Sequence, residues 1–510
     1  MDIFWSVVLR TAQTAIESSS TIFTGILIAA IMRRMLGQAA TRKLFGGSGI
    51  KGLLRAWVIG SLLPICALGV IPVARELRRS GVPPATVLSF ILAAPQLNPL
   101  SFLYGLTLSE PIVILVFVAA TMAIAVFGGQ LWKWCFKDDE QVIDDEPLPP
   151  PGLKRLGIVL VTAARITVSS SALYMLVAIL LTGAIAGGIP HGQMGRTMRH
   201  DDPFSPLLMM GLGLPIYSGV LPGMMRIGLM FEHGNSVGAS FVLFESVVGC
   251  NLGLIAWLVV SYGVRRISIW LLCIVAVVLV SAYAMEKPLY FANEEASHTH
   301  AFDEWTSPFP EGTNVQGATV YDKAMEKVEV LEPLALGGIA FFALLGAGLL
   351  GSDRTDRLDQ WLLKSAPLKE NQQVSVWNRK VPGPVLGFVA LLVLIAFSGV
   401  ALFIYYPDKK QAMEEIRSAR ADAVTAVRVK NYQEAIRQLE QWDLLSRKMQ
   451  VGVFLRTGSL REDQSAATQE LRDVLEEIRD AMIAQDHATG MKFLPQLEEK
   501  HRTFRDLFMK

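Results

Sequence analysis

Charged residues are scarce in this sequence. Asp, Glu, Lys and Arg together make up 18% of its 510 residues, whereas 52% are hydrophobic. Soluble globular domains carry about 25% charged residues, and the formal net charge of +1 provides no basic excess that would attract a polyanion. The composition therefore argues against a soluble protein, and we expect no nucleic-acid partner.

Cysteines and catalytic motifs are also few. The four cysteines show no CxxC spacing, which argues against a disulfide framework and against a zinc site. The Walker A, HExxH and GxSxG motifs do not occur. We therefore predict that the chain is not an enzyme and uses no cofactor. Because no ATPase motif is present, any transport would be driven by an ion gradient, would be passive, or would depend on a separate energising partner.

Long apolar runs dominate what the sequence does contain. A helix needs about 20 mainly apolar residues to cross a bilayer, and eight runs approach or exceed this length. They lie near residues 16–32, 82–106, 111–131, 169–189, 236–262, 267–285, 334–352 and 383–405. The first fifteen residues include Asp2 and lack a basic start, so we interpret them as an interfacial helix rather than a signal peptide. The chain is predicted to be an all-α integral membrane protein, multi-pass in a bacterial inner membrane and surrounded by membrane lipid.

The positions of basic residues predict the orientation of these spans. Lys and Arg cluster at 33–55 and at 265–266, and such clusters favour the cytoplasmic side of a membrane. The charged, proline-rich linker at 136–155 is then cytoplasmic, and the acidic loop at 286–333 is external. Because the number of spans is even, both termini are predicted to be extracytoplasmic.

Proline and glycine interrupt two further apolar segments, GSLLPICALGVIPVA at 60–74 and GLGLPIYSGVLPG at 211–223. A break in a helix frees backbone groups, which must then be satisfied inside protein or in a water-filled cavity. A similar break is expected in AAPQLNP at 93–99. The residues that we expect to break helices are Pro64, Gly69, Pro72, Pro95, Pro99, Pro215, Gly219 and Pro222.

The two broken segments begin similar stretches of sequence. Each is followed by a glycine-containing turn and then by a small-residue span that carries an asparagine, Asn98 or Asn251. Basic clusters flank the first broken segment on both sides, whereas an external loop precedes the second. The segments are therefore predicted to be re-entrant and the repeats to be inverted. Inverted repeats with broken helices are typical of secondary transporters, which bind substrate at the repeat interface.

The predicted organisation has six parts. These are permease repeat 1 (1–135), a cytoplasmic linker (136–155), permease repeat 2 (156–285), an external acidic loop (286–333), two additional transmembrane helices (334–405) and an extracytoplasmic helical domain (406–510). Apolar positions recur with helical periodicity after residue 406, but no run there is long enough to span a bilayer. The predicted fold class is an inverted-repeat, transporter-like bundle with two re-entrant broken segments, followed by a soluble C-terminal helical bundle.

Polar and thiol side chains inside the apolar segments are the candidates for a substrate path. They are Cys66, Gln96, Asn98, Glu245, Cys250 and Asn251. An ionised carboxylate is costly within a membrane, so Glu245 is either a proton-coupling group or a neutral carboxyl bonded to a neighbouring helix. The amides either contact substrate beside the breaks or stabilise a kink, and each cysteine is either a soft ligand or a small buried apolar side chain. The sequence leaves any metal site unknown.

The stretch PICALGVIPVARELRRSGVPPATVLSFILAAPQLNP at 64–99 resembles the signature of the predicted-permease family that includes ArsP-type organoarsenical efflux permeases. The resemblance extends over about residues 15–285 and implies secondary efflux of a metal, a metalloid or a related small solute. Leu68 stands where the family commonly has a second cysteine. A lone Cys66 would hold a trivalent arsenical weakly, because such a soft centre favours two or three thiolates. The alternative is a non-transporting membrane scaffold or sensor that binds an extracytoplasmic protein partner through residues 406–510.

Overall fold

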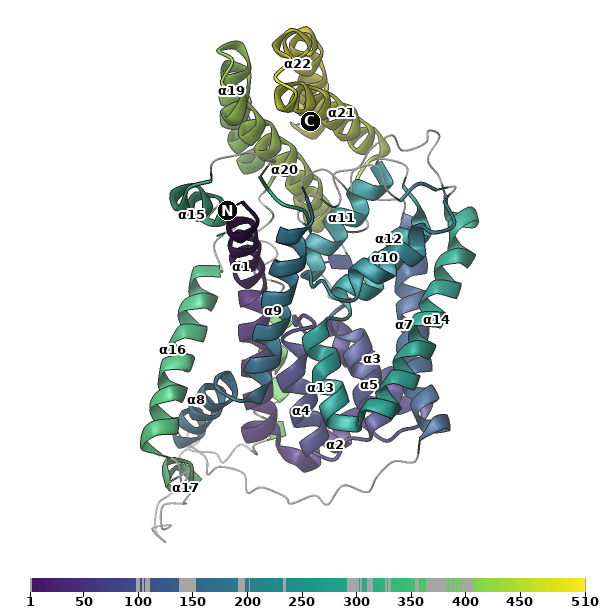
Figure 1. The fold of residues 1–510 in the computed structure, drawn as a ribbon, viewed down its shortest axis with the longest axis vertical. Helices are drawn as coiled ribbons and strands as arrows, with labels where there is room; N and C mark the ends of the chain where they lie inside the picture. The colour runs from purple at the N-terminus through teal and green to yellow at the C-terminus, as the bar shows by residue number, and fades with distance from the viewer. Residues whose placement is uncertain are drawn as a thin grey trace. The chain divides into compact units, whose positions relative to one another are not determined.

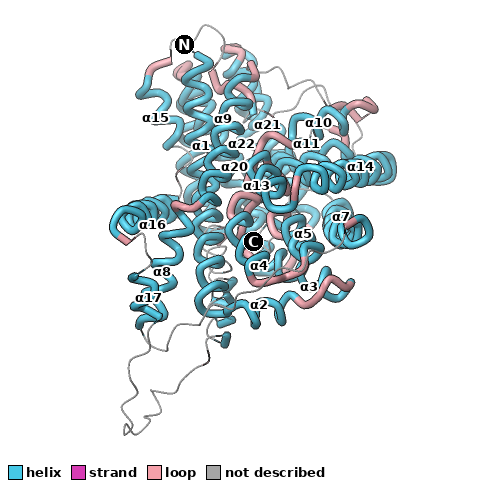
Figure 2. Tube along the Cα trace, turned by 60° about the horizontal axis from the view of Figure 1, so that its bottom comes forward, coloured by secondary structure: helices cyan, strands magenta, loops and turns pink. Residues whose placement is uncertain are grey.

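The structure is a computed structural model in which the regular elements of the described residues are helices (Figures 1 and 2). It describes residues 2–97, 101, 102, 105, 111–136, 153–190, 198–200, 202–232, 235–290, 302, 305–309, 315–325, 328, 332–353, 357–363, 382, 384, 385, 388, 389, 391–393, 395, 396, 399, 406 and 408–509. Two compact units are present. Residues 1–102 and 112–396 form the membrane unit, and residues 406–509 lie in the C-terminal unit.

The described part of the membrane unit is built from helices. In chain order they are α1 (Asp2–Ile31), η1 (Met32–Leu36), α2 (Gly37–Phe45), α3 (Ile50–Leu62), α4 (Val70–Arg79), α5 (Pro84–Ala93), α7 (Pro111–Cys135), α8 (Leu153–Thr167), α9 (Ser170–Gly188), α10 (Ser205–Gly213), α11 (Val220–Glu232), α12 (Val237–Leu243), η2 (Phe244–Val248), α13 (Leu252–Tyr262), α14 (Val264–Leu289), α15 (Gly317–Met325), α16 (Glu332–Ser352) and α17 (Arg357–Leu363). The elements η1 and η2 are π-helical turns.

Five of the predicted spans are confirmed as helices long and apolar enough to cross a membrane. They are the run from α1 to α2, and the helices α7, α9, α14 and α16. The span predicted at 236–262 is instead a pair, α12–η2 and α13, bent by 61°. The span predicted at 82–106 is helical only as far as Ala93 in its first part. The span predicted at 383–405 lies largely outside the described residues.

The first fifteen residues do not form a separate interfacial helix, which corrects the prediction. Helix α1 runs unbroken from Asp2 to Ile31, about 45 Å at 1.5 Å per residue. Its N-terminal half packs against α9, where a Cβ atom on Gly183 or Gly187 would overlap the α1 backbone. Small residues that allow such close approach are typical of helix packing in membranes. The start of the chain is therefore part of the membrane bundle.

Both predicted broken segments are interrupted helices (loop-coloured breaks in Figure 2). Helix α3 ends at Leu62 and α4 begins at Val70, and residues 214–219 separate α10 from α11 in the same way. Pro64 and Pro215 lie inside these breaks, and Pro95 lies in the turn after α5.

Pro72 and Pro222 do not break a helix, contrary to the prediction. Each is the third residue of the helix that follows the break, α4 or α11. The amide groups of the first helical turn have no acceptor within the helix, so a proline there removes no hydrogen bond. These two prolines therefore favour the start of the second half-helix.

Protein groups satisfy the backbone that the breaks release. The amide of Tyr217 donates to Thr182 Oγ1 of α9 at 3.0 Å, and the amide of Ser218 donates to the carbonyl of Val247 in η2 at 3.0 Å. The first break packs against α1, where a Cβ atom on Gly69 would lie 2.6 Å from the carbonyl oxygen of Thr21. Glycine is required at this position because of the close approach.

Helices α16 and α17 are tied to the rest of the membrane unit by buried charges. Asp359 of α17 pairs with Arg34 at 3.3 Å and with Arg165 at 2.8 Å, and Arg165 also pairs with Asp353 at 3.0 Å. Arg34 lies on η1 and donates to Thr162 Oγ1 of α8 at 2.9 Å. Arg165 therefore joins α8 to the segment after α16.

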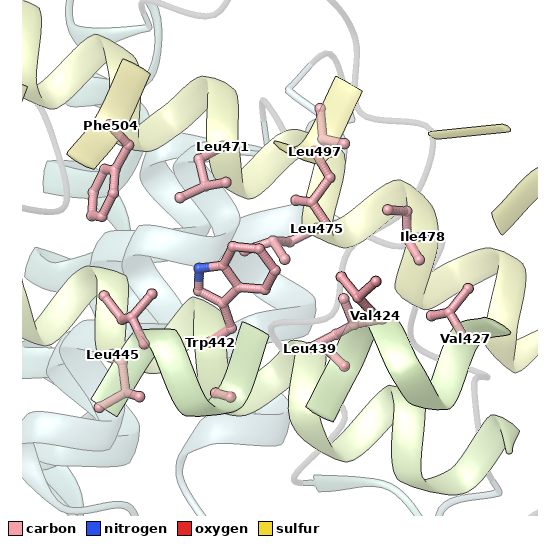
Figure 3. Packing of buried hydrophobic residues seen from close by; sticks show 14 of the residues in the cluster. Val424, Val427, Leu439, Trp442, Leu445, Leu471, Leu475, Ile478, Leu497 and Phe504 are labelled. Atoms are coloured by element: carbon pink, nitrogen blue, oxygen red, sulfur yellow. The ribbon is translucent and has the colours of Figure 1, made fainter. Parts of the chain in front are cut away.

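Four helices make up the described C-terminal unit, at the positions that the periodicity predicts. They are α19 (Lys409–Arg428), α20 (Tyr432–Thr457), α21 (Glu462–Ile483) and α22 (His487–Met509). Their buried faces meet around Trp442, with Leu439, Leu475 and Phe504 among the residues that surround it (Figure 3). This apolar core is the source of the stability that we expect for the unit.

The second helical hairpin of this unit repeats the first. Lys430 and Gln485, which lie 55 positions apart, both adopt positive φ values of 61° and 56°. The next residue in each hairpin, Asn431 or Asp486, donates its amide to a carbonyl of the preceding helix at 2.9 or 2.8 Å. Buried residues recur at the same offset: Ile416 and Leu471, Ala423 and Ile478, Leu439 and Leu494, Met449 and Phe504. The pattern indicates a tandem duplication that was not predicted from the sequence.

Candidate substrate site

Cys66 lies in the first break and is 1% exposed. Its Sγ accepts a hydrogen bond from the amide of Gly69 at 3.4 Å, so the thiol takes part in the turn that begins α4. Cys250 is half-buried and lies between η2 and α13. Within the described residues, no three His, Cys, Asp or Glu side chains are grouped as metal ligands would be.

Gln96 and Glu245 form a direct contact between the two halves of the membrane unit. Gln96 Nε2 donates to Glu245 Oε2 at 2.6 Å across 149 residues of sequence, and both side chains are buried. Gln96 follows α5, and Glu245 lies on the π-helical turn η2. π-Helical turns inside α-helices occur frequently at functional sites. A Cβ atom on Gly249 would lie 2.5 Å from Gln96 Nε2, so this glycine leaves the room that the amide occupies.

Asn251 has a structural role that its sequence position did not reveal. It is the N-cap of α13, and its Oδ1 accepts a hydrogen bond from the amide of Leu254 at 2.8 Å. The residue is fully buried. It therefore restarts the helix after the 61° bend. The predicted path residue Asn98 and the predicted breaker Pro99 lie outside the described residues.

A pocket that was not predicted from the sequence lies between α1, α9, the second break and α11. We call it the arginine pocket. It is lined by Arg10, Gln13, Thr14, Glu17, Thr182, Ala186, Tyr217, Ser218, Arg226 and Trp305. None of the predicted path residues is among its described lining, but the Tyr217 hydroxyl lies beside the side chains of Cys66 in the first break and Thr21 of α1. The pocket thus adjoins both breaks.

Both arginines of the pocket are held in defined orientations by the segment around residue 305. Arg10 donates to the carbonyl oxygen of Thr306 from Nε at 3.0 Å and from Nη2 at 2.8 Å. Arg226 donates to Ser218 Oγ, and its guanidinium lies 4.6 Å from the centre of the Trp305 ring. Glu17 and Arg10 are both close enough to Arg226 to interact with it electrostatically.

Part of the predicted external loop at 286–333 is folded onto α1. Phe309, Val320 and Ala324 form a small buried cluster with Leu9 of α1. The Ser307 hydroxyl lies 2.8 Å from that of Ser6. These contacts hold Trp305 and Thr306 against the pocket.

Two signals in the sequence could have indicated this pocket. Arg10, Gln13 and Glu17 are spaced by three and four residues, which places them on one face of a continuous helix. Arg226 is an ionisable residue inside an apolar segment, and such residues are functional candidates by default. The first signal depends on α1 being one continuous helix from Asp2 to Ile31.

Comparison with known proteins identifies a family and a more distant relative. A family model described as "Predicted permease", of ArsP type, matches residues 4–287. The UPF0718 protein YcgR of Bacillus subtilis (strain 168) is 27% identical over 134 residues, which are 26% of this chain and 46% of that protein. The chain thus spans about half the length of this relative. No solved structure shows a significant match. The family match confirms the resemblance carried by residues 64–99 and extends from α1 almost to the end of α14.

Proposed function

The chain belongs to this predicted-permease family, and from this premise we propose that it is a secondary permease whose solute passes between the two broken helices. The observation that carries the proposal is the arginine pocket, which adjoins both breaks within the membrane unit. Charged groups are costly in a membrane and mark substrate or ion pathways there. Discontinuous helices around such a site are a recurrent feature of transporters.

The pathway would open by relative movement of the two broken halves. In this proposal the repeats are inverted, the broken segments are re-entrant, and the chain lies in an inner membrane with both termini outside the cytoplasm. The Gln96–Glu245 hydrogen bond crosses from one half to the other, so it is a natural element to break or form during such a movement. Glu245 would then carry the coupling proton, as its position within an apolar span suggested.

The substrate and direction follow from the family resemblance. We propose export of a metal, a metalloid or a related small solute. The absence of a second thiol at Leu68 favours a substrate that does not need chelation by neighbouring cysteines.

A partner-binding role for the C-terminal unit is a second proposal. Stacked helical hairpins often provide binding surfaces for other proteins, and the tandem duplication of α19–α20 in α21–α22 gives this unit such an architecture. This role accompanies transport and does not replace it.

Flux through purified protein tests the permease proposal. The full chain would be reconstituted in liposomes, and release of preloaded solutes would be measured for a panel of carboxylates, oxyanions, cations and neutral solutes. We expect saturable flux of at least one class, and loss of that flux in Arg226→Gln but not in Arg265→Gln, which changes an exposed arginine. Absence of flux for every class, in vesicles where both orientations are present, would favour the scaffold interpretation.

A further inference from the structure

The two broken segments and the helices beside them keep one register in sequence and in structure. Ile65 and Ile216 lie 151 positions apart inside the breaks, and Phe90 and Phe241 have the same offset on α5 and α12. All four side chains are buried. The succession of α3, break, α4 and α5 therefore corresponds to that of α10, break, α11 and α12.

Each break packs on a long helix of its own repeat through the same pattern of residues. In the first repeat, Gly69 touches Thr21 of α1, and a Cβ atom on Gly25, four positions later, would overlap Gly69 as well. In the second repeat, Thr182 of α9 accepts a hydrogen bond from the backbone of the break, and Ala186, again four positions later, lines the pocket beside it. Both pairs of helix residues have an offset of 161 positions. The two repeats therefore share contacts as well as sequence.

At two places, residues in equivalent positions of the two repeats touch each other. Cys66 and Tyr217 are the third residues of the matching triplets Pro-Ile-Cys and Pro-Ile-Tyr, and the Tyr217 hydroxyl lies beside the Cys66 side chain. Gln96 and Gly249 each lie two positions before the asparagine of their repeat, and a Cβ atom on Gly249 would lie 2.5 Å from Gln96 Nε2. A twofold operation exchanges equivalent residues, so such residues can touch each other only at the axis.

The repeats differ in length at the turn that carries Glu245. Leu92 and Leu243 lie 151 positions apart, whereas Gln96 and Gly249 lie 153 positions apart, so the second repeat has two additional residues in this interval. The π-helical turn η2 lies there, and such a turn contains more residues than an α-helical one. The hydrogen bond from Gln96 to Glu245 therefore joins non-equivalent positions.

From these observations we infer that a pseudo-twofold axis relates the two repeats and passes through the Cys66–Tyr217 and Gln96–Gly249 contacts. The Cys66–Tyr217 contact, where the two breaks meet, is the pivot of the transport movement. This second statement rests on the proposed function, whereas the axis itself does not. Inverted repeats are related by such an axis in the plane of the membrane.

The axis assigns different roles to the two kinds of contact. When inverted repeats exchange their conformations, a contact between equivalent residues is converted into itself and keeps its geometry. A contact between non-equivalent residues is converted into a different one, so it belongs to one state. Cys66 and Tyr217 are therefore positioning residues that hold the two breaks together while the surrounding helices move.

Exchange of the two equivalent residues tests the axis without measuring transport. Tyr217→Cys leaves a cavity, and Cys66→Tyr places two phenol rings at one buried site, so each should lower the thermal unfolding temperature of the full chain in detergent. On an axis the two positions have the same surroundings, so the double variant Cys66→Tyr/Tyr217→Cys should regain at least about half of the larger loss. If Cys66→Tyr alone does not fold, a folded double variant is the supporting result. A double variant that shows no recovery, or does not fold, would overturn the axis.

Touching residues in non-equivalent positions provide the matched control. Thr182 contacts the second break at Tyr217, but its equivalent in the first repeat is Thr21 and not Cys66. The exchange Thr182→Tyr/Tyr217→Thr should therefore show no recovery over its single variants. Equal recovery in both exchanges would mean that contact alone is sufficient, and it would overturn the axis.

Reversible cross-linking in proteoliposomes tests the pivot. A short bifunctional methanethiosulfonate would join Cys66 to the cysteine of Tyr217→Cys, in a chain whose other three cysteines are replaced by alanine. The comparison is Phe117→Cys/Phe241→Cys in a chain without native thiols, because Phe117 of α7 and Phe241 of α12 are non-equivalent residues whose rings lie 5.1 Å apart between the repeats. Each bridged protein is compared with the same protein after reduction of the bridge. The 66–217 bridge should leave at least about half of the flux, whereas the 117–241 bridge should lower it at least about 10-fold, because it fixes one state.

The outcomes separate this inference from the permease proposal. Loss of flux with the 66–217 bridge would overturn the pivot, and so would flux that survives both bridges. A 66–217 bridge that does not form where the 117–241 bridge does would overturn the contact. If no form of the protein shows flux, the permease proposal fails, and the residue exchange still decides the axis.

Discussion

Charged side chains form ion-pair clusters in both units, and in the membrane unit they also line a pocket. In the C-terminal unit, the half-buried carboxylate of Asp443 accepts from Arg472 at 2.7 Å and from Arg447 at 2.9 Å, so two arginines neutralise its charge. Burial alone would raise the pKa of Asp443, but the charges of Arg447 and Arg472 outweigh it and bring that pKa to about 2. In the membrane unit, Arg10, Glu17 and Arg226 line the arginine pocket.

The two units also use interruptions of helices differently. In the C-terminal unit the chain turns between complete helices, at Lys430 and Gln485, and the helices themselves stay continuous. In the membrane unit the interruptions lie within apolar segments, at 63–69 and 214–219, and neighbouring helices satisfy backbone groups of the second break. Ion pairs closed within a cluster and continuous helices favour stability. Charged groups that line a pocket and interrupted helices favour ligand binding. Substitutions in the C-terminal unit should therefore change stability, and those in the membrane unit should change ligand binding and flux.

The largest effect is expected from Ile478→Ala in the C-terminal unit. Ile478 is fully buried, and truncation of such a side chain costs about 2–5 kcal/mol. We predict that a fragment of residues 406–510 folds alone and that this variant lowers its free energy of unfolding by that amount, measured by circular dichroism in urea. The matched control is Ile483→Ala on the same helix, where the side chain is 53% exposed and the expected change is within about 0.5 kcal/mol. A disordered wild-type fragment would contradict the prediction.

Acidification should destabilise the same unit through His501. Burial, together with the charges of Arg420 and Arg505, lowers the pKa of this imidazole from 6.5 to about 4. Because the unfolded chain binds the proton more readily, the contribution to stability is complete above pH 6.5 and is lost as the pH falls towards 4. It amounts to about 3 kcal/mol.

Urea unfolding of the fragment between pH 7 and pH 4 measures this dependence. His501→Phe should remove most of this pH dependence, because phenylalanine does not titrate. Its ring can still pack on Trp442, since the ring centroids of Trp442 and His501 lie 5.2 Å apart. An unchanged slope in His501→Phe would show that other groups cause the loss. Asp443 affects the pH dependence only below this range. Its stabilising effect is complete above pH 3.8 and is lost as the pH falls through about 2.

In the membrane unit, Glu245→Gln should alter flux much more than stability. The amide keeps the shape of the carboxyl group, and the hydrogen bond from Gln96 becomes a neutral one, which costs about 1 kcal/mol. We expect flux in proteoliposomes to lose its pH dependence, because an amide does not titrate. Asp322→Asn changes an exposed acid on α15 and should behave like the wild type. Wild-type pH dependence in Glu245→Gln would remove this residue from the coupling mechanism.

Local chemistry predicted the elements of the fold well, and tertiary contacts were harder to predict. Apolar runs and prolines indicated α7, α9, α14, α16 and both breaks, because length and backbone constraints act locally. Gln96 and Glu245 were each identified as polar residues in apolar spans, but nothing local could indicate that they bond to each other across 149 residues. The same limitation applied to the arginine pocket, whose lining comes from α1, α9, α11 and a loop residue near 305.

The tandem duplication escaped detection for a different reason. Equivalent positions in the two hairpins of the C-terminal unit keep burial but not identity, as in Trp442 and Leu497, or Ser446 and His501. A core constrains volume and polarity more than residue type. The 55-residue offset between the two hairpins is defined by their turns, where Lys430 and Gln485 both have positive φ values.

The smallest effect is expected at two helix N-caps, one in each unit. Asn251 caps α13 from a fully buried position at 2.8 Å, whereas Asn431 caps α20 from an exposed position at 3.4 Å. Replacing an N-cap asparagine by alanine costs about 0.5–2 kcal/mol. We predict the upper part of that range for Asn251→Ala, because the amide of Leu254 is left without its acceptor in a buried site, and the lower part for Asn431→Ala. Thermal unfolding of the full chain measures the first, and urea unfolding of the fragment measures the second.

A serine at position 251 separates the two roles of this residue. Asn251→Ser keeps a capping oxygen and should restore most of the stability lost in Asn251→Ala, since serine caps helices as well as asparagine does. If flux is restored together with stability, Asn251 acts by restarting α13 after the bend. If stability returns while flux stays low, the amide itself contacts the solute, as its place in the sequence suggested. That second outcome would extend the path from the arginine pocket towards η2, and it would make this cap, unlike the one at Asn431, part of the transport machinery.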